Sequence, residues 1–189
     1  PQIGDYTVTG TIGAATGTAT IHATIETVHH IVVSPATATI TAGTLQTFTV
    51  EGFDAVDSMG DFTADTTFTI SAPGACVANA CGATVVGDYT VTATYGLYTD
   101  TATLHVTAAA LHHLVLSPDV VTIEADMSQT YTAEGFDQYD NTRGDVTAST
   151  TFTITAPGTC TGATCDVPQI GDYTVTGTIG AATGTATIH

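Results

Sequence analysis

Aspartates gather in two loops of this sequence, at spacings that could hold a divalent cation. Each set starts at the end of a Glu-Gly-Phe-Asp motif, and the six residues are Asp54, Asp57, Asp61, Asp137, Asp140 and Asp145. Calcium takes six to eight oxygen ligands, and several carboxylates on one tight loop would supply part of such a set. The spacing is not that of an EF-hand, and an Asp/Gly turn that closes a hairpin explains the same residues. We therefore expect turns here, with calcium as the only candidate cofactor.

Histidines recur in two sets as well. They are His22, His29 and His30 near one expected junction and His105, His112 and His113 near the next. Clusters of imidazoles bind zinc or copper. Strand alternation places His105 on the outer face beside Thr103, and one member of each His-His pair must also point outward. We expect exposed or packing histidines at the junctions; the alternative, metal binding, would stiffen a joint.

The four cysteines form two pairs with the same spacing, Cys76 with Cys81 and Cys160 with Cys165. This spacing has neither the histidine nor the second CxxC that a zinc site needs. Two small disulfide loops are therefore expected, which indicates an oxidising compartment.

Threonine alternates with apolar residues along much of the chain, as in Thr37-Ala-Thr39-Ile-Thr41. A period of two with β-branched residues predicts strands with one buried face and one wet face, and no stretch has a convincing helical period. The threonine ladders could accept O-linked sugars or order water, but β propensity and solubility explain them without a ligand. The chain reads as all-β.

The charge balance excludes two classes of partner. Asp and Glu number 18, whereas Arg143 is the single basic residue besides histidine, and the formal net charge is −17. Nucleic acid and anionic lipid need Lys and Arg to neutralise phosphate, so we expect no nucleic-acid partner.

No apolar stretch is long enough for membrane insertion. No phosphate loop, nucleophile elbow or HExxH motif appears, so we expect no enzyme.

An internal repeat sets the domain organisation. Four motifs occur twice: residues 29–35 and 112–118, 51–54 and 134–137, 66–70 and 150–154, and 87–92 and 171–176. The offset grows from 83 to 84 because the second copy has one extra residue within 140–144. We expect domains at 29–106 and 112–189, with linkers at 23–28 and 107–111. Linkers this short predict domains stacked end to end.

A third, partial copy stands at the start, because residues 1–22 are identical to residues 168–189. The favoured interpretation is a window on a longer chain with a two-domain period, in which 1–22 are the last two strands of a preceding domain. The alternative is an N-terminal hairpin that swaps into a neighbouring subunit. Both predict a linear assembly, since an isolated hairpin cannot bury a core.

Each unit contains enough short apolar-polar runs for a Greek-key sandwich. In the first unit we expect strands at 29–34, 37–41, 45–53, 61–63, 66–71, 83–86, 88–95 and 99–106. The side chains expected to face inward are Ile31, Val33, Ala38, Ile40, Phe48, Val50, Phe68, Ile70, Tyr89, Val91, Ala93, Ala102 and Leu104.

The runs HHLVLSP, EGFDQYDNTRGD, STTFTI and GDYTVTGT, with the CTGATC loop between the last two, resemble the bacterial immunoglobulin-like (Big-type) repeats of large surface proteins. The resemblance covers essentially the whole chain. It implies tandem immunoglobulin-like β-sandwiches stacked as a rod, outside the cell or on its surface, with no catalytic residues. The function expected is a structural component of an extracellular filament whose partner is itself, end to end or along a longer chain. The stalk of an adhesin, or a calcium- or carbohydrate-binding module, is the alternative.

Overall fold

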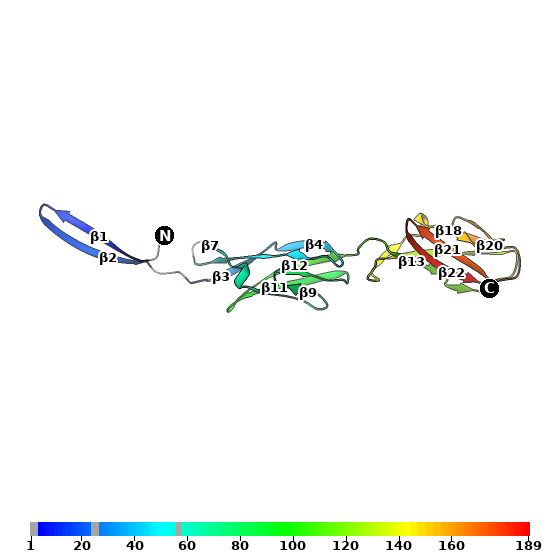
Figure 1. Ribbon diagram of the computed structural model, residues 1–189, viewed down its shortest axis with the longest axis horizontal. Helices are drawn as coiled ribbons and strands as arrows, with labels where there is room; N and C mark the ends of the chain where they lie inside the picture. The colour runs from blue at the N-terminus through cyan, green and yellow to red at the C-terminus, as the bar shows by residue number, and fades with distance from the viewer. Residues whose placement is uncertain (1–3, 24–26, 56–57) are drawn as a thin grey trace.

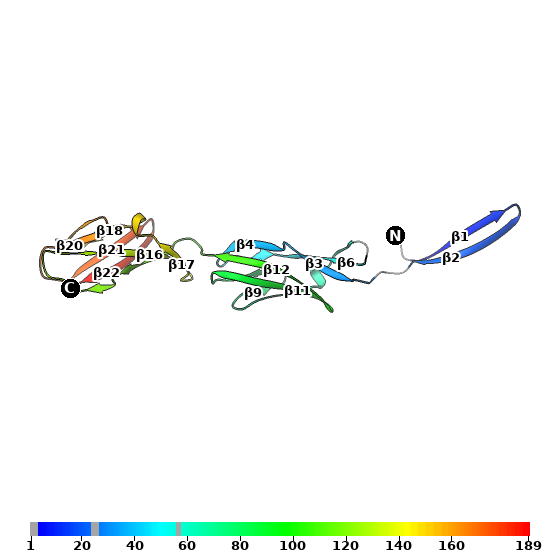
Figure 2. The ribbon, with the colours of Figure 1, turned by 180° about the vertical axis from the view of Figure 1, so that it is seen from behind.

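The computed structural model describes residues 4–23, 27–55 and 58–189. A hairpin and two β-sandwiches follow one another along its long axis (Figures 1 and 2). In the described residues the only helical segments are two short 3₁₀ turns, η1 (Thr63–Asp65) and η2 (Thr147–Ser149). No helix of the described part is long and apolar enough to cross a membrane. The chain is therefore an all-β protein built from tandem sandwiches.

The first sandwich contains ten strands. They are β3 (His30–Ser34), β4 (Thr37–Thr41), β5 (Gln46–Thr47), β6 (Thr49–Phe53), β7 (Ser58–Asp61), β8 (Thr67–Ile70), β9 (Ala75–Val77), β10 (Ala80–Gly82), β11 (Gly87–Tyr95) and β12 (Tyr98–Thr107). One layer is the four-stranded sheet β4-β12-β11-β8, in which β4 and β12 run parallel. The other layer contains β3-β6-β7 and β5-β10-β9. The adjacent strands β5 and β6 join these two small sheets, with Phe48 between them.

The core lies between the two layers and follows the alternation read from the sequence. Ten of the thirteen residues expected to face inward are buried, and the other three, Ala38, Ile40 and Ile70, are partly buried against the same cluster. Threonines of β11 and β12 pair across the outer face of the sheet, such as Thr90 with Thr103. The prediction of the core is confirmed.

The second sandwich repeats this arrangement. Its strands are β13 (His113–Ser117), β14 (Val120–Val121), β15 (Met127–Thr130), β16 (Thr132–Phe136), β17 (Thr142–Asp145), β18 (Thr151–Ile154), β19 (Thr159–Thr161), β20 (Thr164–Val167), β21 (Tyr173–Ile179) and β22 (Ala182–Ile188). The sheets are β14-β22-β21-β18, β13-β16-β17 and β15-β20-β19. A tyrosine at the start of the penultimate strand of each domain donates to a carbonyl four residues upstream, Tyr89 to Val85 and Tyr173 to Gln169. Immunoglobulin-like folds use this tyrosine corner at the same place.

Two expected strands are corrected by the structure. Residues 83–86 are a loop, because the backbone around Val85 and Val86 turns there to enter β11 rather than pairing in a sheet. The expected strand 61–63 ends at Asp61, and Thr63 begins η1. The cysteine loops, for which no strand was expected, are themselves hairpins, β9-β10 and β19-β20.

The N-terminal segment forms a separate hairpin of β1 (Gly4–Ile12) and β2 (Ala15–Ala23). Every residue of β1 is exposed, including Tyr6, Val8 and Ile12. Residues 1–3 of the identical copy lie outside the described residues. The hairpin therefore has an apolar face without a core.

One position distinguishes the two cores. Phe48 of the first domain corresponds to Tyr131 of the second, and both side chains are fully buried. The Tyr131 hydroxyl has no hydrogen-bond partner among the described residues, and burial raises the pKa of this phenol. A buried hydroxyl without a partner loses its bonds to water and regains none.

Tyr131→Phe should therefore raise the free energy of unfolding of the second domain by about 1 kcal/mol, because it removes an unsatisfied polar atom and keeps the ring. The reverse change, Phe48→Tyr, should destabilise the first domain by a similar amount. Urea unfolding followed by near-ultraviolet circular dichroism measures both. A loss of stability in Tyr131→Phe would contradict the assignment.

Candidate functional site: the joint between the domains

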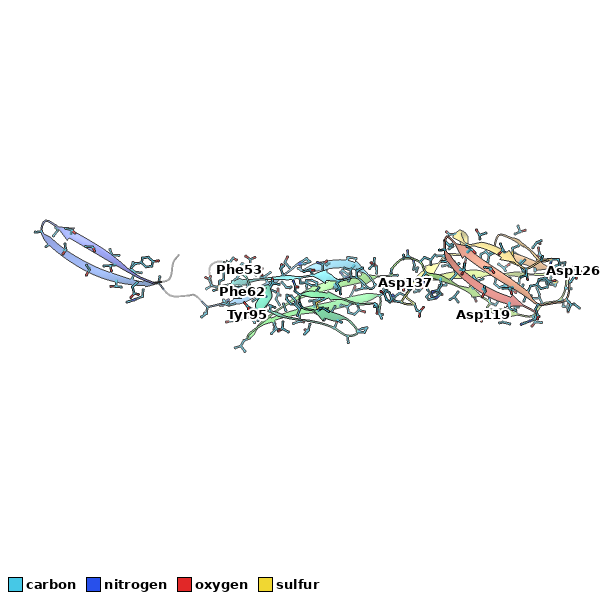
Figure 3. All side chains as sticks on the ribbon, in the orientation of Figure 1. Phe53, Phe62, Tyr95, Asp119, Asp126 and Asp137 are labelled. Atoms are coloured by element: carbon cyan, nitrogen blue, oxygen red, sulfur yellow. A yellow bond between two sulfur atoms is a disulfide. The ribbon has the colours of Figure 1, made fainter. Side chains whose placement is uncertain are left out.

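Residues 108–112 connect β12 of the first domain to β13 of the second, and loops from both domains meet there. Asp137 lies in this region between the two sandwiches (Figure 3). A hollow of about 330 Å³ opens between Thr41–Thr44 of the first domain and Gln138 and Tyr139 of the second. The contacts in this region determine how firmly one domain is held on the next.

Asp137 is the only fully buried charged residue of the described chain. Its carboxylate accepts hydrogen bonds from the backbone N–H groups of Ala109 at 2.8 Å, Tyr139 at 2.8 Å and Asn141 at 3.0 Å, and from Asn141 Nδ2 at 2.9 Å. Burial on its own would raise the pKa of this carboxyl. The hydrogen bonds from Asn141, Ala109 and Tyr139 outweigh burial and lower the pKa to about 2, because they stabilise the charged form. Asp137 therefore ties the linker to the turn that follows β16.

Asn141 carries the contact from this turn to the first domain. Its Nδ2 donates to the carbonyl of Thr84 at 2.7 Å, and its Oδ1 accepts from the backbone N–H of Val86 at 2.9 Å. One amide side chain thus satisfies two backbone groups of the preceding domain while it also bonds to Asp137. The loop at 83–86 and the turn at 137–141 are held together in this way.

Two further side chains complete the joint, Tyr139 of the same turn and Arg143 of the strand β17 that follows it. Arg143 Nη1 donates to the carbonyl of Ala109 and lies 3.5 Å from that of Ala108, so the one arginine of the chain holds the linker backbone. Tyr139 packs on Gly43 of the first domain so closely that a Cβ at Gly43 would lie 2.0 Å from the tyrosine hydroxyl. Gly43 also has a positive φ of 81°. Glycine is therefore required at this contact.

Of the six aspartates predicted as calcium ligands, the five that the structure describes do not converge. No group of three His, Cys, Asp or Glu side chains in residues 4–23, 27–55 and 58–189 is placed to hold a metal ion. The Asp137 carboxylate is occupied by N–H donors, and Asp61 and Asp145 accept from the backbone N–H of Thr63 and Thr147 at the starts of η1 and η2. The pKa of both carboxyls is lowered, first by hydrogen bonds with the hydroxyls of the same threonines and then by these backbone bonds. Asp57 lies outside the described residues, and calcium binding stays a prediction.

Asp54 and Asp140 are the other two of these residues. Asp54 occupies the position of Asp137 in the first domain, and Asp140 Oδ1 lies 3.7 Å from His113 Nε2.

The predicted histidine sets are also spread over several partners. His22 pairs with Asp5 and His105 with Asp88 across their hairpins, with Nδ1–Oδ1 distances of 2.5 Å in both. His30 stacks on Phe53 and His113 on Phe136, while His29 lies edge-on to the ring of His30 and His112 to that of His113. Metal binding by His22, His29, His30, His105, His112 and His113 stays a prediction. Their observed contacts are aromatic packing and hydrogen bonds to aspartates across a hairpin.

The cysteines are paired as their spacing predicts, Cys76 with Cys81 and Cys160 with Cys165, and the described chain has no free thiol. Cys81 and Cys165 are fully buried. Each disulfide crosslinks the two strands of a short hairpin at the edge of the core.

The joint residues Asn141, Tyr139 and Arg143 were not identified as a site from the sequence. The available signal was the extra residue within 140–144, which lengthens this loop relative to the first domain. No asparagine occurs at 55–61, so the bridge made by Asn141 has no counterpart there.

Asp137→Asn should destabilise the second domain by about 2 kcal/mol at neutral pH, because an amide nitrogen then faces N–H groups that need an acceptor. The folded-state pKa lies below the unfolded value, so the stabilisation from the carboxylate is complete above about pH 4 and is lost as pH falls through about 2. The difference between wild type and variant in urea unfolding should shrink over this range. Asp166→Asn, at an exposed position, is the control and should show no such trend.

Neither a protein-family model nor a curated protein sequence matches the chain. Among solved structures, invasin, described as a bacterial integrin-binding protein, is 16% identical with a TM-score of 0.52; the match covers 100% of this chain and 46% of invasin. Domains 5–6 of the S-layer protein SbsC are 16% identical over 86% of this chain and 97% of theirs, with a TM-score of 0.37. FdeC, an Escherichia coli adhesin, is 16% identical over 84% of this chain and 62% of its own, with a TM-score of 0.44.

The chain thus spans less than half the length of invasin. At this level of identity the likeness to invasin shows the fold alone. Together with the sheet order and the tyrosine corners, it shows that the chain is a tandem array of immunoglobulin-like β-sandwiches.

Proposed function

We propose that this chain is a structural segment of an extracellular rod or filament, built from immunoglobulin-like domains that are held end to end. The observation that carries the proposal is the bonded joint. Asn141 bonds to two backbone groups of the preceding domain, and Asp137 and Arg143 hold the linker between them. A protein whose task is to keep a fixed spacing needs such a joint, whereas a flexible tether does not.

The disulfides and the composition of the surface support a location outside the cell. Both disulfides are expected to persist only in an oxidising compartment. The net charge of −17 and the threonines on the outer faces of the strands keep a long β-rich surface soluble and discourage pairing between edges. The proposed partner is the repeat itself, and the role requires no catalysis.

The stalk of a surface adhesin is a second form of the same role. It differs from a filament in what flanks the repeats: a stalk ends in a domain of another kind, which carries the binding site. The structural likeness to invasin makes this form the natural alternative, although it bears on the fold alone.

Asn141→Ala should loosen the joint and leave both cores intact, because it removes the bonds to Thr84, Val86 and Asp137 and no apolar core contact. Arg143 is the single trypsin site of the chain and lies in β17, two residues after Asn141, so cleavage reports opening of the joint. We expect trypsin to cut the variant about tenfold faster than wild type, and small-angle scattering to show a broader distribution of domain angles. Ser128→Ala, at an exposed position of the second domain away from the joint, is the control. Equal cleavage rates for Asn141→Ala and wild type would contradict a rigid joint.

Electron microscopy of the native material, combined with its mass under denaturing and reducing conditions, tests the filament itself. We expect rods with an axial repeat of two domains. A mass far above 19.1 kDa would indicate one long chain of repeats, and a mass near that value would indicate separate subunits. Rods that end in an unlike domain would favour the stalk, and isolated 19.1 kDa particles would refute the filament.

A further inference from the structure

The N-terminal hairpin already has the conformation of the last hairpin of the second domain. Residues 1–22 and 168–189 have one sequence, and their strands pair in one register. Tyr6 lies opposite Ile21 as Tyr173 lies opposite Ile188, and the tight turn starts after Ile12 as it does after Ile179. Asp5 pairs with His22 as Asp172 pairs with His189. The hairpin therefore has the strand register of β21-β22 but lacks the other strands of a domain.

Its environment is the reverse of that of β21-β22. Val8 is 52% exposed, whereas its counterpart Val175 is 0% exposed. Ile21 is 56% exposed against 0% for Ile188. In the second domain β21-β22 also pairs on both edges, with β18 on one side and β14 on the other. The N-terminal hairpin pairs with no third strand among the described residues. An apolar face with two open edges is a binding surface for the missing strands of a sandwich.

Two glycines show which sandwich fits. A Cβ at Gly184 would lie 2.2 Å from the carbonyl oxygen of Leu114, and a Cβ at Gly177 would lie 2.9 Å from Leu116 Cδ2. The second domain thus requires glycine at 184, where the backbone of β13 crosses its last hairpin, whereas a larger residue at 177 would displace the Leu116 side chain. The N-terminal copies, Gly10 and Gly17, have open space around them. The hairpin carries glycines that have no use in its present position.

The first domain has different residues at these positions. Ala93 and Asp100 stand where the hairpin has Gly10 and Gly17, and Asp100 Oδ2 accepts from the backbone N–H of Val33 at 2.8 Å. A hairpin with glycine at this position would leave that N–H without its acceptor. The fit therefore selects a domain of the second type.

The chain that follows the hairpin is also suited to end-to-end stacking. His22 and His30 are as far apart in sequence as His105 and His113, which flank the joint between the two domains. Val28 packs against the core of the first domain as Leu111 packs against that of the second. A domain closed by the N-terminal hairpin would be followed by the first domain after a linker of the same length as the one observed.

We propose that residues 1–22 close a second copy of the domain formed by residues 112–167, taking the place that β21-β22 has in the present copy. The proposal rests on the end-to-end assembly proposed above and names the contact that continues it. The partner must lack its own last hairpin, because replacing one hairpin by an identical one buries no additional surface. Residues 1–189 contain two such hairpins and one acceptor, so a protein of these residues alone should stay monomeric.

The test opens the acceptor within the full chain. Gly184→Val places a branched apolar side chain against the Leu114 carbonyl and should expel β21-β22, so that the N-terminal hairpin of another molecule can enter. We expect this variant to form linear oligomers in sedimentation velocity, whereas wild type and Thr183→Val stay monomeric. Thr183 is the exposed neighbour in the same strand and serves as the matched control. The double variant Gly17→Val/Gly184→Val should be monomeric, since neither hairpin fits.

A synthetic peptide of residues 1–23 provides the second measurement. It should bind to Gly184→Val, dissolve the oligomers and restore protection of the second domain in hydrogen exchange, whereas a peptide with Gly17→Val should do none of these. A monomeric Gly184→Val protein that does not bind the peptide would overturn the proposal, as would oligomers that persist in the double variant. The trypsin test on Asn141→Ala does not depend on what the hairpin binds. A negative result for the hairpin would therefore not contradict the proposed rod.

Discussion

Each sandwich depends on burying the inner face of its last hairpin. In the first domain β11 and β12 are the two central strands of the four-stranded layer, and Val91 and Leu104 at their centre are fully buried. In the second domain β21 and β22 have the same place, with Val175 and Ile188. Since these strands come last, each domain acquires its central strands only when its final residues are in position. The order of the chain therefore makes the end of every domain the condition for its core.

Much of the fold could be predicted from the sequence because alternation of polar and apolar residues shows which face of a strand is exposed to water. The thirteen inward residues of the first domain all pack in its core, since Thr and apolar residues alternate without error along the long strands. Strands of three residues, such as β9 and β10, are too short for alternation to show. The strand expected at 83–86 was wrong because it was inferred from β propensity alone. Val85 and Val86 are β-branched, but they are exposed in the turn before β11.

The joint could not be predicted in the same way, because its contacts join residues with no pattern between them. Asn141 bonds to Thr84 and Val86 through single polar atoms, and nothing in the intervening sequence indicates that these loops meet. The aspartate cluster was visible as a pattern, but pattern alone does not distinguish a carboxylate that awaits a cation from one that collects N–H groups. Asp137 is of the second kind: its neighbours fold around it as donors.

The shorter loop of the first domain has a mechanical consequence. It has no asparagine at 55–61, so a domain of that type lacks the amide that fastens a domain to the one ahead. In a continuous array, fastened and unfastened joints would alternate. Bending would then concentrate at every second joint, as in a chain of rigid two-domain links, and each link would be about twice as long as a single sandwich. Under a lateral load such an array would bend at the joints that lack this amide, while each pair of domains would keep its length.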